Sequence, residues 1–195
     1  MRLARPAALV LLLAGALQAG FCPAAGDAGP HHDFQFFAGY SAASATLIGT
    51  TTDRRMLLAG FAYGYRCWSW NSVSISYTAA AMPLATLIEP GHWVYGFAVA
   101  PVGFTFQFAR ERRVHPFVET MGGIIASSQP IPQNQPDASG LNFFFDFGGG
   151  IRWRAGQRGA VSMGYRFLHI SNAGTTRFNP GVDNNVFYAA YSFLR

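Results

Sequence analysis

Apolar and polar residues alternate along most of this chain, with a period of two. Successive side chains of a β-strand point to opposite faces, so this period is typical of strands with one apolar face. The clearest example is the segment 72–82, where Val73, Ile75 and Tyr77 alternate with serine and threonine. Eight such segments tile the chain, at about 33–43, 55–68, 72–82, 93–108, 114–127, 142–153, around 165–172, and at 185–194. The pattern therefore predicts an all-β protein of eight strands.

The connections between these segments alternate in length. Those after the second, fourth and sixth segments are short, at 69–71, 109–113 and 155–159. Those after the first, third, fifth and seventh are longer, and the longest, 128–141, contains three prolines. This alternation predicts antiparallel hairpins with short turns at one end and long loops at the other. Within the fourth segment the alternation changes phase near Pro101, which predicts a β-bulge.

The first 25 residues have a different pattern, which is typical of a secretory signal peptide. Arg2 and Arg5 precede an apolar run at 7–17, and small residues follow. Cleavage after Ala19 and cleavage after Ala25 both fit, so we expect a signal peptide at 1–25 and a single β domain at 26–195. Losing the two arginines lowers the formal charge from +5 to +3, too little to indicate nucleic-acid binding.

The composition of the remaining chain favours a membrane protein that crosses the bilayer with strands. Aromatic residues make up 15% of the chain and charged residues only 12%. After the signal peptide no run of about 18 apolar residues remains for a membrane helix. Each predicted strand reaches the roughly 9–11 residues that a tilted membrane strand needs. We therefore expect an eight-stranded antiparallel transmembrane β-barrel of the bacterial outer membrane, with short periplasmic turns and longer outer loops.

The faces opposite the apolar ones should line the inside of this barrel. They carry Arg66, Asp146, Arg152 and Arg166 among serines and glycines. An eight-stranded barrel has an interior just wide enough for side chains, so these charges predict a hydrogen-bonded plug rather than a channel. Cys67 has no cysteine at metal-type or CxxC spacing and is interpreted as an inert filler of its strand.

The seventh segment places two reactive residue types on its apolar face. Ser171 and His169 share that face with Phe167 and Tyr165, and the strand direction places the pair at the outer-leaflet end. A serine nucleophile needs a base, a carboxylate that orients the base, and donors for the oxyanion. The following loop, 172–183, supplies Asp183 as the carboxylate. Candidate oxyanion donors are the Asn179 amide and the backbone N–H groups around Ala173 and Gly174.

The segments His169-Ile-Ser171-Asn172-Ala-Gly174 and Asn179-Pro-Gly-Val-Asp183 resemble the PagL-type lipid A 3-O-deacylases. That family consists of eight-stranded outer-membrane barrels with a His-x-Ser-Asn motif and an active site on the lipid-facing outside. The resemblance implies that His169 is the base, Ser171 the nucleophile and Asp183 the acid. It implies that Asn172, Gly174 and Asn179 bind the oxyanion or substrate, and that no metal or other cofactor is needed.

One position departs from the family pattern. The family's acid is a glutamate, and Asp183 is one methylene shorter. Because glycines give the loop freedom to shift, we predict that this position accepts either acid.

Taken together, the residues and the resemblance predict a serine esterase that removes the 3-linked hydroxyacyl chain of lipid A. Its partners would be lipopolysaccharide and outer-membrane lipids, and a homodimer is left open. Arg54, Arg55 and Arg177 are expected at the outer rim, either solvated or near lipopolysaccharide phosphates. Two alternatives remain: a structural or adhesion barrel without catalysis, and a lipid A acyltransferase. The lumen charges leave little apolar room for the acyl chain that an acyltransferase would hold inside the barrel.

Overall fold

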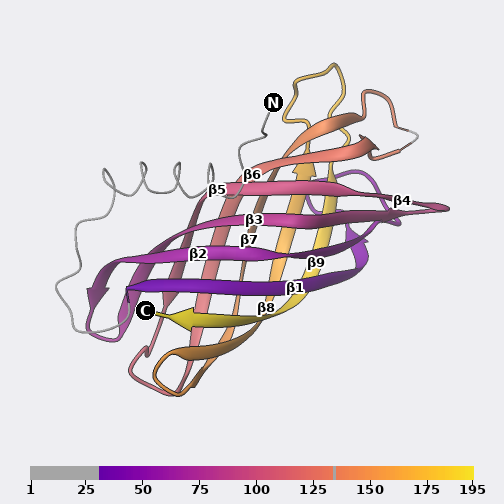
Figure 1. The fold of residues 1–195 in the computed structure, drawn as a ribbon. Helices are drawn as coiled ribbons and strands as arrows, with labels where there is room; N and C mark the ends of the chain where they lie inside the picture. The colour runs from indigo at the N-terminus through magenta and orange to yellow at the C-terminus, as the bar shows by residue number, and fades with distance from the viewer. Residues whose placement is uncertain (1–30, 134) are drawn as a thin grey trace, which may run out of the picture.

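The computed structural model describes residues 31–133 and 135–195, all of them in strands and connections of one antiparallel barrel (Figure 1). The strands are β1 (His32–Ala45), β2 (Arg55–Trp70), β3 (Val73–Glu89), β4 (His92–Val94), β5 (Gly96–Gln107), β6 (Val114–Ile131), β7 (Ser139–Ala155), β8 (Gly159–Ser171) and β9 (Val182–Leu194). Each long strand pairs with its neighbours along the chain, and β1 pairs with β9. The ring is therefore closed.

The predicted eight strands are confirmed, with the fourth one split at Tyr95. Its first part, β4, pairs only with β3, and its main part, β5, pairs with β3 and β6. The bulge predicted at Pro101 is also confirmed, because the registers of β5 with both neighbours shift there. Tyr77 donates a hydrogen bond to the carbonyl of Pro101 across this irregularity.

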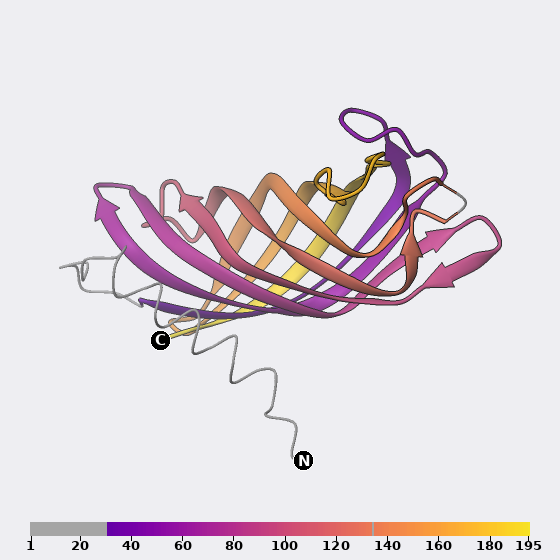
Figure 2. The ribbon, with the colours of Figure 1, turned by 90° about the horizontal axis from the view of Figure 1, so that it is seen from above.

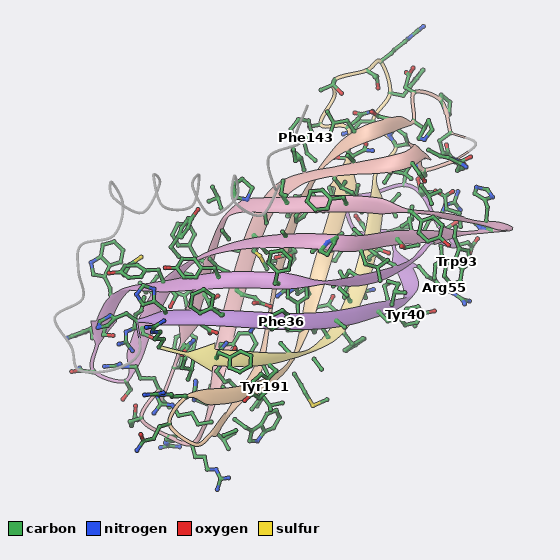
Figure 3. The ribbon with its side chains drawn as sticks, in the orientation of Figure 1. Phe36, Tyr40, Arg55, Trp93, Phe143 and Tyr191 are labelled. Carbon is green, nitrogen blue, oxygen red and sulfur yellow. The ribbon has the colours of Figure 1, made fainter. Side chains whose placement is uncertain are left out.

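The outer wall of the barrel is apolar along its whole height. Side chains such as Phe36 and Tyr191 project from it, as the sticks in Figure 3 make visible. Tryptophans gather towards its two ends: Trp70 and Trp153 beside the short turns, and Trp93 at the opposite end. An apolar band between two aromatic levels is the surface expected of a strand-built membrane protein. No helix in the described residues is long and apolar enough to cross a membrane.

The long connections gather at one end of the barrel, at the upper right of Figure 1, and the short turns and the C-terminus at the other (Figures 1 and 2). Two of the predicted long loops are wrong. The third connection is a hairpin, because β3 runs on to Glu89 and turns at Pro90-Gly91 into β4. The fifth is also shorter than 128–141, since β6 extends to Ile131 and β7 starts at Ser139. These strands are longer than predicted because their backbone pairing continues past the end of the apolar alternation.

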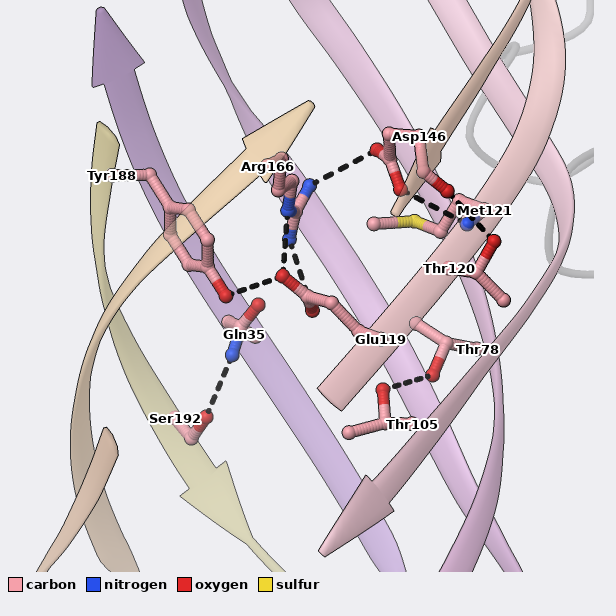
Figure 4. Close-up of polar contacts among 10 residues, drawn as sticks. All are labelled: Gln35, Thr78, Thr105, Glu119, Thr120, Met121, Asp146, Arg166, Tyr188 and Ser192. Atoms are coloured by element: carbon pink, nitrogen blue, oxygen red, sulfur yellow. Dashed lines mark hydrogen bonds and ion pairs between the residues drawn. The ribbon is translucent and has the colours of Figure 1, made fainter. Parts of the chain in front are cut away.

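The interior is a plug of ion pairs and hydrogen bonds, as predicted. Arg166 contacts Glu119 at 2.7 Å and Asp146 at 3.8 Å, and Tyr188 donates to Glu119 at 2.5 Å (Figure 4). Arg152 binds Asp33 at 2.7 Å nearer the short turns. Two small cavities of about 30 and 40 Å³ are found in this part of the lumen. Arg66, Asp146, Arg152 and Arg166 are all buried.

Two further sequence-based expectations concern the signal peptide and Cys67. The signal peptide and its cleavage at Ala19 or Ala25 lie outside the described residues. The interpretation of Cys67 as an inert filler of β2 is wrong, because this buried residue is disulfide-bonded in the structure.

Candidate active site on the outer wall

The outer end of β8 places His169 and Ser171 on the outward face of the barrel. Their cross-strand neighbours on β7 are Phe145 and Phe143, which are 39% and 42% exposed on the outer wall. The intervening Ile170 points inward and belongs to the buried core. The predicted outward column on this strand is therefore confirmed. The two polar residues are nevertheless only 7% and 8% exposed, so something covers them.

Asp183 lies directly opposite His169 in the antiparallel pair of β8 and β9. The prediction that it belongs to the loop after β8 is wrong, because β9 begins at Val182 and Asp183 is its second residue. Strand pairing therefore fixes the spacing of the two side chains. The distance from His169 Nδ1 to Asp183 Oδ1 is 2.6 Å, and the carboxylate is completely buried.

The second carboxylate oxygen of Asp183 accepts three backbone hydrogen bonds. The N–H groups of Leu47, Ile48 and Gly49, in the loop between β1 and β2, donate to Oδ2 at 2.7, 2.7 and 2.9 Å. Four donors thus hold this carboxylate in one orientation. With the Nδ1 proton directed at Asp183, the imidazole presents Nε2 as its basic nitrogen.

The loop 46–54 also covers the imidazole. The N–H groups of Thr50 and Thr51 both donate to the carbonyl of Gly181 at 3.1 Å. Gly181 lies so close to the imidazole that an added Cβ would be 2.6 Å from Cε1 of His169. Packing of this closeness requires glycine at this position. This loop and the residues at the start of β9 therefore together cover the imidazole of His169, the candidate base.

Aromatic rings form the side of the site that faces β7. The rings of Phe145 and His169 are 5.3 Å apart, and those of Phe147 and Phe167 are 5.2 Å apart. No hydrogen bond joins Ser171 Oγ to His169 within the described residues. Catalytic contacts of this kind are often long without substrate and tighten when it binds. The arrangement thus places the candidate nucleophile, Ser171, and the candidate base, His169, on the same face of an apolar wall.

Asn172 organises the loop that follows β8. Its Nδ2 donates to Thr176 Oγ1 at 2.7 Å and to the carbonyl of Phe178 at 2.8 Å. Its Oδ1 accepts the N–H of Gly174 at 2.9 Å, and its own N–H donates to Asn179 Oδ1 at 3.1 Å. Asn172 itself is 1% exposed. Its polar groups are therefore used within this loop and, through Nδ2 and the carbonyl of Asp137 at 3.4 Å, against the β6–β7 connection.

These hydrogen bonds distinguish the two residues that the sequence analysis proposed as oxyanion donors, Gly174 and Asn179. Gly174 has a φ of +74°, and its N–H is already bonded to Asn172, so in this conformation it shapes the turn. Asn179 uses Oδ1 as an acceptor, which leaves its Nδ2 as the donor that could meet an oxyanion. The sequence-predicted residues thus form two adjoining groups: His169, Ser171 and Asp183 on the strands, and Asn172, Gly174 and Asn179 in the loop after β8.

Of the three rim arginines, two have close partners. Arg54 pairs with Glu89 at 3.0 Å and thereby connects the covering loop to the β3–β4 hairpin. The guanidinium of Arg177 lies 5.4 Å from the ring of Phe178. Arg55 lies at the outer end of β2, on the same side as Tyr40 and Trp93 (Figure 3).

Sequence reasoning missed the covering loop. Leu47, Ile48 and Gly49 contribute backbone groups only, and their side chains carry no signal of this role. It also missed Asn185, which accepts a hydrogen bond from Tyr165 at 2.6 Å beside the site. That residue had a signal: it is a polar side chain with the outward parity of Asp183 and Phe187.

Comparisons with known proteins agree on one family. A family model described as lipid A 3-O-deacylase (PagL) matches residues 58–192. The lipid A deacylase PagL of Pseudomonas aeruginosa is 34% identical over 101 residues, which are 51% of this chain and 55% of that protein. The aligned part thus spans about half of that relative.

Two solved structures share the fold. The crystal structure of the outer membrane enzyme PagL has a TM-score of 0.58 and 22% identity, covering 80% of this chain and 97% of that one. The crystal structure of Neisserial surface protein A has a TM-score of 0.52 and 12% identity, covering 83% of this chain and 96% of that one.

Proposed function

This chain belongs to the lipid A 3-O-deacylase (PagL) family, and we propose that it is itself a serine esterase that removes the 3-linked hydroxyacyl chain of lipid A. The observation that carries the proposal is the pair of His169 and Asp183, joined at 2.6 Å on the outer wall of the barrel, with Ser171 on the same face. A buried base with a fixed carboxylate has little structural use on a lipid-facing wall. It has a direct use in hydrolysing a lipid ester.

In the proposed reaction, Ser171 Oγ attacks the ester carbonyl while His169 Nε2 takes its proton. The tetrahedral intermediate carries a negative oxygen, for which Asn179 Nδ2 is the candidate donor. Collapse breaks the bond to the sugar oxygen, which leaves with the proton held by His169. Water, activated by the same imidazole, then hydrolyses the acyl-serine and releases the free fatty acid. Asp183 stabilises the imidazolium in both halves of the reaction.

The position of the site matches the position of this ester in a bilayer. The site lies at the outer end of β8, and the apolar wall with Phe145 and Phe167 extends from it towards the middle of the membrane. A lipid A molecule in the outer leaflet of the bacterial outer membrane could thus reach Ser171 laterally, with its acyl chains against the wall. The 3-linked ester lies near the boundary between sugar and hydrocarbon, at the level where the polar residues stand.

The two alternative functions explain less of the molecule. An acyltransferase with an acyl chain inside the barrel would need apolar space, whereas Arg166, Glu119 and Asp146 occupy the lumen. A structural or adhesion barrel accounts for the fold but leaves the four hydrogen bonds on Asp183 without a purpose.

Mass spectrometry of lipid A tests this proposal. Cells that make the protein should lose the mass of one hydroxyacyl chain from lipid A, and cells that make Ser171→Ala should not. The purified protein in detergent should release the same free 3-hydroxy fatty acid from lipopolysaccharide. Unchanged lipid A in both settings, with a folded barrel, would refute the proposed activity.

A further inference from the structure

The covering loop, 46–54, is attached to other parts of the barrel at three places. Its first part donates three backbone hydrogen bonds to Asp183, and its middle part donates two to the carbonyl of Gly181. Both of these attachments lead to the start of β9. The third is at Arg54, the last residue of the loop, which pairs with Glu89 at the end of β3. This third attachment is made by side chains, and it connects the loop to a different hairpin.

The pair of Arg54 and Glu89 joins three outer connections of the barrel. The distance from Arg54 Nε to Glu89 Oε2 is 3.0 Å, and the two side chains are 11% and 1% exposed. Arg54 Nη1 also donates to the carbonyl of Thr52 at 2.9 Å, across Asp53, which has a φ of +58°. Both carboxylate oxygens of Glu89 accept the N–H of Gln133, in the connection between β6 and β7, at 3.1 and 2.9 Å. One guanidinium and one carboxylate thus hold the end of the covering loop against two neighbouring connections.

A buried ion pair of this kind favours a role in orientation rather than in stability alone. Removing both charges from water offsets much of their attraction, and apolar side chains of similar volume often stabilise a protein equally well. A guanidinium does provide direction, because its N–H groups form a rigid planar fork. Arg54 uses this fork on Glu89 and on the backbone of its own loop. The pair therefore fixes where the loop ends and how it turns.

The need for such precision comes from the hydrogen bond between His169 and Asp183. Nδ1 of the imidazole lies 2.6 Å from Oδ1 of the carboxylate, while the three loop N–H groups bind the other oxygen, Oδ2. A shift of the loop would therefore turn the carboxylate and move Oδ1 relative to the imidazole. Misplacing a catalytic group by about 1 Å can lower a rate by about 10²-fold. The position of the loop thus affects the orientation of the candidate base.

We propose that Arg54 and Glu89 are positioning residues of the candidate active site, which hold the covering loop so that Asp183 stays oriented towards His169. The inference rests on the proposed deacylase function and extends that site to the end of the covering loop and the end of β3. Both residues act through the loop backbone and the carboxylate. They should therefore affect turnover more than substrate binding.

Steady-state kinetics on lipopolysaccharide, with the full-length protein in detergent, test this role. Glu89→Gln directs an amide at Arg54 and should lower kcat about tenfold, with KM within about twofold. Arg54→Met should lose about as much, whereas Arg54→Lys should stay within about threefold, because its ammonium can still pair with Glu89. The double variant Arg54→Met/Glu89→Gln leaves neither charge of the pair buried without a partner, so it should fold and show the same loss of about tenfold.

A double-mutant cycle with Asp183→Asn shows whether the effect passes through the carboxylate. Adding Glu89→Gln to Asp183→Asn should lower kcat by less than about twofold further, because the carboxylate that the loop orients is already lost. A full second loss of about tenfold would mean that Arg54 and Glu89 act by another route, and would overturn the positioning role.

Asp33→Asn is the matched control at the other end of the barrel. Asp33 pairs with Arg152 at 2.7 Å, so this variant also breaks an arginine–carboxylate pair, but it should keep kcat. Unchanged kcat in Arg54→Met/Glu89→Gln would overturn the positioning role and leave the deacylase proposal standing. A loss seen only in KM, or an equal loss of kcat in Asp33→Asn, would do the same. A folded, unaltered protein that cleaves no lipopolysaccharide would instead overturn the proposed function, and the positioning role with it.

Discussion

Strand β8 carries two buried polar clusters, one on each of its faces. On the inner face Arg166 is held by Glu119 and Asp146, and on the outer face His169 is held by Asp183 (Figure 4 for the inner cluster). Both contain buried carboxylates from other strands: Asp146 on β7 and Glu119 on β6 inside, and Asp183 on β9 outside. They differ in the partner of the carboxylate: a permanently charged guanidinium inside, and an imidazole that can gain and lose a proton outside.

Because of this difference, the inner cluster of β8 has a structural role, whereas the outer cluster has the proposed chemical one. Inside, Arg166 is shared by two carboxylates beside small cavities of about 30 and 40 Å³, so the cluster fills space and links strands β6, β7 and β8. Outside, the carboxylate is fixed by three backbone N–H groups as well as by His169, while Nε2 of the imidazole is left for a reacting group. Substitutions on the two faces should therefore have opposite consequences for activity and stability.

The largest effect on activity should come from removing the nucleophile or the base. Ser171→Ala and His169→Ala should each lower deacylation by about 10⁴-fold or more, because such residues act as one unit. Both variants should still give a folded, heat-modifiable barrel, since neither side chain belongs to the inner cluster. Release of free fatty acid from lipopolysaccharide measures the loss. Normal turnover in either variant would remove the outer cluster from the chemistry.

Asp183→Asn should be nearly as damaging. The amide retains one oxygen, which the N–H groups of the covering loop would take, and it would then direct an NH₂ group at His169 Nδ1. This favours the wrong tautomer of the imidazole, an effect of about 10³–10⁴-fold in serine hydrolases. The measurement is kcat on purified lipopolysaccharide. A loss confined to KM would assign Asp183 to substrate binding.

The substitution Asp183→Glu tests a revised expectation. The sequence favoured tolerance, because a loop residue could shift. The structure places Asp183 in a strand, completely buried, with Gly49 packed so closely that an added Cβ there would be 3.0 Å from Oδ1. We therefore expect the extra methylene to displace the imidazole or the loop and to lower kcat about 10–10²-fold, the scale of misplacing a catalytic group by about 1 Å. Activity equal to that of the unaltered protein would mean that the covering loop adjusts freely.

Gly181→Ala should also lower kcat by displacing the imidazole of His169, but to a smaller extent. Its Cβ would lie 2.6 Å from Cε1 of His169, so the ring or the backbone must move. We expect roughly a tenfold loss of kcat, because partial misplacement of the base costs less than a wrong tautomer. Gly122→Ala is the control, since a Cβ there meets only the Phe144 carbonyl at 3.8 Å. Equal kcat for both variants would argue against tight packing over the imidazole.

The two faces of β8 also show which features of the structure could be predicted from the sequence. Period-two alternation located the strands and assigned Arg166 inward and His169 outward, because parity is a property of the local chain. Register is not local. The direct pairing of His169 with Asp183 depends on where β9 begins, and the extension of β3 to Glu89 depends on its partner β4. The hydrophobic pattern predicts neither the first residue of β9 nor the extension of β3.

The covering loop shows a second limit. Leu47, Ile48 and Gly49 act through backbone N–H groups, which every residue except proline carries. Sequence reasoning finds functional side chains by their chemistry, and here the chemistry belongs to the main chain. The same limit applies to Gly181, whose role is the absence of a side chain next to His169.

The smallest effect on turnover, and the largest on stability, should come from Arg166→Met. Methionine leaves Glu119 and Asp146 buried without their cation, and breaking a buried ion pair by removing one partner costs about 3–5 kcal/mol. Urea titration in detergent should record this loss, while turnover per folded molecule should stay within about threefold, because the outer cluster shares no partner with Arg166. Adding Glu119→Gln should recover part of the stability, since the second change removes an uncompensated charge. A well-folded Arg166→Met barrel without activity would contradict the separation of the two faces, because it would mean that the inner cluster sets the position of the base on the other side of the same strand.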